Sequence, residues 1–209
     1  HPDVPVHLVA GSLRPHLQAP LDNASRQALA AHWQSVAALS GQPFSDPQAL
    51  PEPLIYNVRP ASQALIVARA LDVERLWPFV RAMQQAFFAE CMDITRPAVL
   101  LEIAAANGYD PVEFAARFDQ ADTQQLLDED WGWAADRGLA ELPILFAERD
   151  GQLALLCQLV VLVNLLNATF LKGVRGESEL ERYAAGEDMS ELISSSFAAH
   201  SAHSQRVST

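Results

Sequence analysis

A predicted β-hairpin in the last third of the chain is the feature that most constrains its fold. An apolar stretch begins at Leu142, with Pro143 at its entry, where a missing N–H costs least. Asp150-Gly151 follows, a dipeptide typical of a two-residue hairpin turn. A second apolar stretch then returns over residues 153–157. The sequence therefore predicts two antiparallel strands joined by a tight turn.

The residues before this hairpin are predominantly helical in pattern. Apolar residues recur at helical spacing from Pro60 to Gly138, in five short segments, and a longer helix ending at Gly41 comes before them. A proline-rich loop anchored by Phe44 and Leu50 joins the two parts. The side chains predicted to cap the helices are Asp22 or Asn23, Asp72, Thr95 and Asp110. Before all of these, residues 4–10 alternate and predict a strand.

The charge of the chain excludes two classes of partner. Its 209 residues hold 26 acidic and 14 basic side chains, for a net charge of −12, and Lys172 is the single lysine. A chain this acidic, without a basic run, has no positively charged region that would bind nucleic acid or an anionic membrane surface. Half of the residues are apolar and 19% are charged, which predicts a globular domain.

Residues 153–171 are long and apolar enough to raise the question of a membrane span. They contain Gln158, Asn164 and Asn167, which are costly in hydrocarbon, and the Asp-Gly turn assigns their first five residues to a strand. No span is therefore expected. Residues 158–193 are interpreted as an apolar run and a C-terminal helix, and residues 194–209 as a low-complexity tail.

Cys91 and Cys157 are the candidate redox thiols. Two cysteines 66 positions apart are too few for a disulfide scaffold and wrongly spaced for zinc. Burial as structural thiols is the commoner fate, because neither has the helix-N-terminal position that stabilises a thiolate. No metal site is expected, and the acidic run Asp128-Glu129-Asp130 is interpreted as a solvated helix face. The aromatic side chains are expected in the core rather than around a ligand groove: Phe87, Phe88, Tyr109, Trp131 and Trp133.

The order of these elements resembles an enlarged thioredoxin fold. The run from Gly138 to Phe146 (GLAELPILF), followed by Asp150-Gly151, resembles the cis-proline loop and hairpin of the DsbA-like thioredoxin family. Residues 86–114 are similar to the helical insertion of that family, and residues 6–15 to its second strand and the loop after it. The resemblance is strongest to bacterial members described as protein-disulfide isomerases, and it covers residues 1–157.

The fold implied by this resemblance is α/β and thioredoxin-like, with a large helical insertion. The expected domain is 1–157, with the insertion at about 22–138 and the hairpin at 142–157. The implied function is thiol–disulfide oxidoreduction on protein or small thiol substrates. Glu141, Leu142 and Pro143 would form the substrate-binding loop, with Pro143 in the cis form.

The redox motif of the family does not occur in this sequence. The family carries a Cys-x-x-Cys at the start of its first helix, where the thiolate is stabilised, whereas this chain begins where the second strand would lie. The expectation is that the chain alone does not exchange disulfides. Without the first strand two backbone edges are left unpaired. Three alternatives are compatible with the sequence: the residues belong to a longer protein, a partner supplies the strand, or the run 159–166 fills the gap.

Two other functions are compatible with the sequence. One is a binding module of thioredoxin fold without catalysis. The other is a relative of the kappa-class glutathione transferases and 2-hydroxychromene-2-carboxylate isomerases, which bind glutathione near the same proline and use a serine in place of the first cysteine. No cofactor is expected, apart from glutathione in that alternative. A homodimer is expected. The expected location is the cytoplasm, because the chain begins without a signal peptide.

Overall fold

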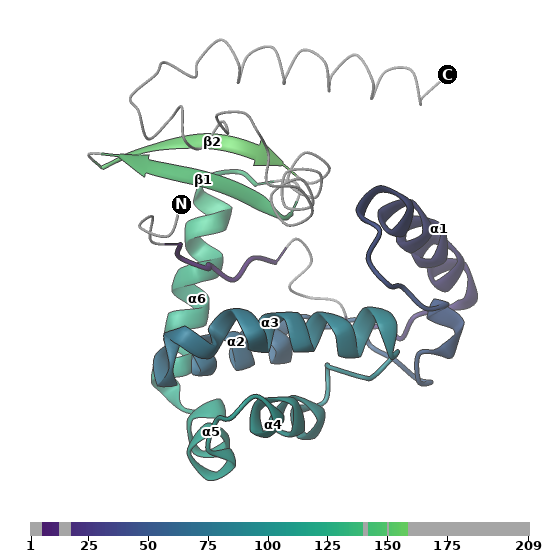
Figure 1. Ribbon diagram of the computed structural model, residues 1–209, viewed down its shortest axis with the longest axis horizontal. Coiled ribbons are helices and arrows are strands. Elements are labelled where there is room, and N and C mark those ends of the chain that lie inside the picture. Colours follow the sequence, from purple (N-terminus) through teal and green to yellow (C-terminus); the bar gives the residue numbers. More distant parts are fainter. Residues whose placement is uncertain (1–5, 13–17, 140–141, 150, 159–209) are drawn as a thin grey trace. The chain divides into compact units, whose positions relative to one another are not determined.

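The computed structural model describes residues 6–12, 18–139, 142–149 and 151–158 (Figure 1). The chain forms two compact units, one of His7–Ala140 and one of His1–Val6 with Glu141–Thr209. The first unit is helical, and the described part of the second contains the hairpin. The run and helix predicted after Gln158, and the tail 194–209, lie outside the described residues.

Helix α1 (Asn23–Ser40) has the ends that the sequence predicts. The Asp22 carboxylate accepts a hydrogen bond from the Ser25 N–H at 2.8 Å, which satisfies a donor of the first turn. Gly41 closes the helix with φ +65°, a left-handed conformation that favours glycine. The ends of α1 are therefore set by residues that are local in sequence.

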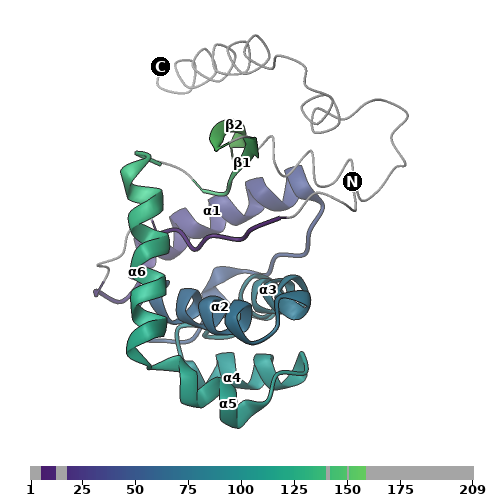
Figure 2. The same ribbon diagram turned by 90° about the vertical axis from the view of Figure 1, so that its left-hand side faces the viewer.

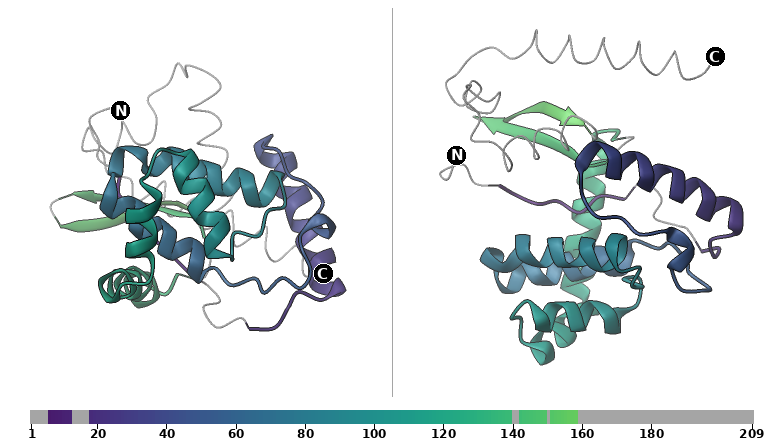
Figure 3. Two further views of the ribbon diagram at one scale, coloured as in Figure 1. Left: turned by 90° about the horizontal axis from the view of Figure 1, so that it is seen from below. Right: turned by 45° about the vertical axis from the view of Figure 1, so that its right-hand side comes forward.

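Five more helices follow α1 in the helical unit. Helix α2 (Arg59–Leu71) packs against α3 (Leu76–Gln84), α4 (Pro97–Ala106), α5 (Pro111–Phe118) and α6 (Ala121–Asp136). Helices α2 and α3 form one layer, with α4 and α5 beneath it (Figure 3). Asp72 and Asp110 cap helical turns as predicted. Short turns η1 (Pro47–Ala49) and η2 (Val73–Arg75) and a π-helical turn η3 (Gln85–Ala89) lie between the helices.

The prediction of Thr95 as a cap of α4 is wrong. Helix α4 begins at Pro97, and Arg96 before it is extended, as a residue preceding proline prefers to be. Proline has no N–H and a fixed φ, so it suits a first helical turn. Thr95 instead bonds locally, through both its N–H and its hydroxyl, to the Asp93 carboxylate.

Two of the three clusters of buried side chains in the helical unit contain most of its core. One is centred on Phe79, Leu100 and Phe114, which are completely buried between α2, α3, α4 and α5. In the other, Trp33 of α1 meets Phe87 edge-on, with 5.5 Å between ring centroids. Tyr109 lies with the first cluster and Phe88 with the second, while Trp131 and Trp133 are partly buried. The aromatic side chains therefore serve mainly as core.

The strand predicted near the start of the chain is not found among the described residues. Residues 6–12 have no regular secondary structure, although they pass beside α2 and α6 (Figure 2). Leu8 packs against the first cluster and Ala10 is buried against Ile66 and Leu127. A strand requires a partner strand for its backbone groups, and no described strand pairs with this segment. We refer to residues 6–12 as the extended segment.

The predicted hairpin is confirmed. Strand β1 (Ile144–Arg149) pairs antiparallel with β2 (Gln152–Gln158), with Ala147 opposite Ala154. The register shifts between Leu145 and Phe146, which pair with Cys157 and Leu155, so Leu156 is an extra residue that forms a bulge in β2. Gly151 in the turn has φ +75°, as the Asp-Gly signal requires. Among the helices that the structure describes, none has the length and hydropathy of a membrane span.

Candidate functional site

The candidate site begins with the two residues directly ahead of β1. The Leu142–Pro143 peptide bond is cis, as the family resemblance implies. Pro143 is exposed and Leu142 is partly buried. Glu141, the third predicted site residue, lies outside the described residues. Leu142 and Pro143 thus form an accessible turn that leads straight into a strand.

The outer edge of β1 extends the surface that this turn presents. An antiparallel strand directs the N–H and C=O groups of alternate residues toward its partner, and the remaining groups point to the opposite edge. Within the described ranges β1 pairs with β2 and with no other strand. A strand edge is the place where an extended chain adds to a sheet through backbone hydrogen bonds.

In the helical unit, an ion pair holds the extended segment. Arg69 of α2 donates from Nη1 to the Leu8 carbonyl at 2.7 Å and from both terminal nitrogens to the Asp130 carboxylate at 3.0 and 3.1 Å. Asp130 of α6 also accepts a hydrogen bond from the Ala10 N–H at 2.7 Å. The pair satisfies a carbonyl and an N–H on one edge of the segment, as a neighbouring strand would do.

This ion pair corrects the prediction that residues 128–130 form a solvated face. Asp128 pairs with Arg59 at 3.3 Å and is mostly exposed, but the Asp130 side chain is only 13% exposed. Residue type alone does not distinguish the two carboxylates. Their positions on the helix do: Asp130 lies three residues after the fully buried Leu127 and so falls near the face that packs inward.

Cys91 has the surroundings of a structural thiol. It is 7% exposed, follows the π-helical turn with φ +54°, and donates from Sγ to the Asp46 carbonyl at 3.5 Å. Burial raises the pKa of the Cys91 thiol above its ordinary value, so the reactive thiolate is disfavoured. Cys157 lies in β2 opposite Leu145, and its side chain is outside what the structure describes. A redox pair of the two stays an untested prediction.

Comparison with known families decides the identity of the fold. A model of the DSBA-like thioredoxin domain matches residues 3–162, which is most of the chain. The chain belongs to this family. Among curated proteins, none matches the sequence. The predicted α/β thioredoxin-like fold with a helical insertion is thereby confirmed, and thiol–disulfide chemistry is supported at the level of the family.

Solved structures of DSBA-like proteins resemble this chain. A putative protein disulfide isomerase from Nitrosomonas europaea is 27% identical, with a TM-score of 0.65, over 74% of this chain and 77% of that one. The cytosolic disulfide reductase DsbM from Pseudomonas aeruginosa is 25% identical, with a TM-score of 0.59, over 68% and 71%. A structure of DsbM with GSH has a TM-score of 0.57 at 22% identity and shares the fold, over 68% and 71%.

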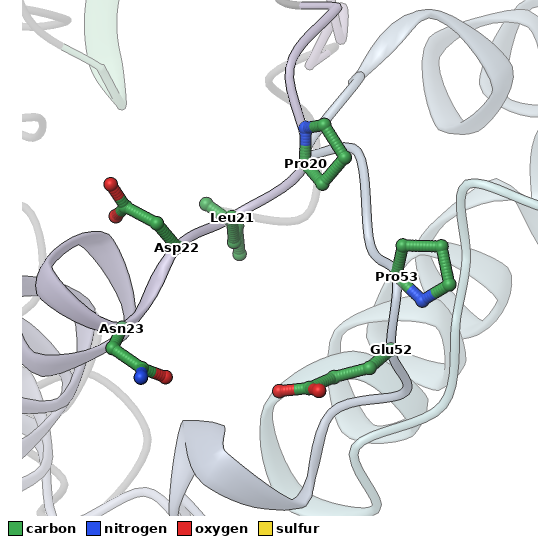
Figure 4. A pocket seen from close by; sticks show the side chains of 6 residues that line it. All are labelled: Pro20, Leu21, Asp22, Asn23, Glu52 and Pro53. Carbon is green, nitrogen blue, oxygen red and sulfur yellow. The ribbon is translucent and has the colours of Figure 1, made fainter.

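The helical unit of this DSBA-like protein has a pocket of about 520 Å³ at the start of α1 (Figure 4). The Asp22 carboxylate there caps the helix, and its hydrogen bond with Ser25 lowers the pKa of Asp22. Its lining contains no thiol, so it offers no nucleophile for disulfide exchange: Pro20, Leu21, Asp22, Asn23, Glu52 and Pro53. Nor do three His, Cys, Asp or Glu side chains gather as a metal site anywhere in the described ranges.

Proposed function

We propose that this chain is the substrate-binding part of a DSBA-like thiol–disulfide oxidoreductase and binds an extended peptide that carries a thiol or disulfide. The observation that carries the proposal is the position of Leu142 and Pro143 at the head of β1, whose outer edge pairs with no described strand. The family match over residues 3–162 supports the substrate class.

Recognition in this proposal rests on the backbone. The β1 edge offers N–H and C=O groups to an extended peptide, which gives affinity that depends little on the side chains of the peptide. Pro143 has no N–H, so at this position the turn contributes only a carbonyl acceptor. The apolar side chains of residues 142–147 add contact area beside the peptide.

The nucleophile is not part of what we propose for these residues. Disulfide exchange needs a thiolate that attacks one substrate sulfur, forms a mixed disulfide and releases the other sulfur as a thiolate. The 209 residues contain no Cys-x-x-Cys, and the buried Cys91 has a raised pKa. We therefore propose binding without turnover for the chain as it stands.

Titration of the 15N-labelled full chain with a capped, extended hexapeptide containing one cysteine tests the binding function. We expect saturable chemical-shift changes in the backbone amides of residues 144–149. Pro143→Ala should weaken binding at least threefold, because it alters the turn that leads into this edge. Pro53→Ala is the matched control, since Pro53 is also exposed but lies in the helical unit. Saturable shifts confined to other residues, or none, would exclude the proposal.

Glutathione is the second candidate ligand, favoured by the structure of DsbM with GSH. It represents the alternative in which the chain is related to glutathione-binding enzymes. Calorimetry with reduced glutathione, alone and after saturation with the hexapeptide, distinguishes the two. Binding of glutathione that the peptide abolishes would indicate one shared site at residues 142–149. A measurable affinity for glutathione and none for the peptide would favour the glutathione-binding alternative.

We propose the cytoplasm as the compartment, on the support of DsbM, which is a cytosolic disulfide reductase. Localisation of the native, untagged gene product by cell fractionation tests it, and recovery in the periplasmic fraction would contradict it. The homodimer stays a prediction. Sedimentation velocity over a hundredfold range of concentration measures it directly.

A further inference from the structure

We draw no further inference here: the strongest candidate, the partly exposed backbone edge of the extended segment at His7, Val9 and Gly11, opposite Arg69 and Asp130, has the form of a strand-pairing surface, but nothing in the part of the chain that the structure describes shows what covers it.

Discussion

Arg26 holds the proline-rich loop against α1. Its side chain is completely buried, and its terminal nitrogens donate to the carbonyls of Pro47, Leu50 and Pro51 at 2.9, 3.0 and 2.9 Å. The Glu52 carboxylate lies 3.5 Å from Nε. A buried guanidinium that satisfies three carbonyls cannot be removed without leaving those acceptors unpaired.

Replacing Arg26 with methionine should therefore destabilise the protein strongly. Methionine keeps much of the apolar stem but none of the donors, and we expect a loss of about 3 kcal/mol in the free energy of unfolding. Urea unfolding followed by circular dichroism measures it. Arg81→Met is the control, because Arg81 is exposed and should change stability by less than about 0.5 kcal/mol. Equal midpoints for the two variants would contradict the role of Arg26.

The raised pKa of Tyr109 makes the stability of the protein fall at alkaline pH. Burial raises its pKa from 10 to about 12, with a further contribution from Asp72, and its hydroxyl donates to the Asp72 carbonyl at 3.0 Å. Between these two pH values the unfolded chain loses the Tyr109 proton while the folded chain retains it. The contribution of Tyr109 to the free energy of unfolding is therefore fully present below pH 10 and falls as the pH rises toward 12.

Urea midpoints measured from pH 8 to pH 11.5 test this dependence. The Tyr109→Phe variant should be less stable at pH 8, because it lacks the hydrogen bond to Asp72, but its midpoint should fall less steeply above pH 10. The midpoint of the variant should still decrease somewhat above pH 10, since burial also raises the pKa of Tyr56. Parallel curves for the two proteins would show that Tyr109 does not contribute.

At the scale of elements, the extended segment depends on Arg69 and Asp130 for its order. Asp130→Ala removes the acceptor of the Ala10 N–H and one side of the ion pair. We expect the Ala10 amide to exchange with deuterium at least tenfold faster, because a hydrogen bond to a charged group contributes about 1.5–3 kcal/mol. Asp136→Ala, at an exposed position of the same helix, is the control.

Amide hydrogen exchange followed by NMR reports on this segment separately from global unfolding. Asp130→Asn should give an intermediate rate, since an amide oxygen can still accept from Ala10 while the charge is lost. If Ala10 exchanges at the same rate in all variants, the ion pair does not order the segment.

The elements that the sequence predicts correctly are those with local causes. The cap at Asp22, the end at Gly41 and the Asp-Gly hairpin each depend on residues within a few positions. The cis form of Pro143 is implied instead by the family resemblance, because most X-Pro bonds are trans and no local signal marks this one as cis. Periodicity fails at η3 (Gln85–Ala89), where an apolar pattern typical of one continuous helix hides a π-helical turn.

The elements that the sequence does not predict depend on distant partners. Residues 6–12 have a strand pattern, but a strand needs a second strand that no local signal supplies. Asp130 and Arg69 are 61 positions apart, and their contact with the segment arises only once α2 and α6 pack together. In the same way, Arg26 is buried and hydrogen-bonded only because a loop about twenty residues later packs over it.

For the whole molecule, the proposed function separates binding from turnover. We expect the 209-residue chain not to accelerate the reduction of insulin by dithiothreitol above the uncatalysed rate, since its sequence contains no Cys-x-x-Cys. Turbidity of the precipitating insulin chains measures the rate, with a dithiol oxidoreductase as the positive control. Turnover that Cys157→Ser abolishes would instead make Cys157 a nucleophile and contradict our proposal.

The hairpin also has a consequence for how the protein behaves in solution. Residues 152–158 of β2 contain no charged residue and no proline, and Leu153 is 41% exposed. Strands at the border of a sheet commonly carry such residues, which oppose the stacking of chains into cross-β aggregates. Replacing Leu153 with lysine would place a charge in this strand that opposes aggregation. The yield of refolded protein at high concentration should therefore rise.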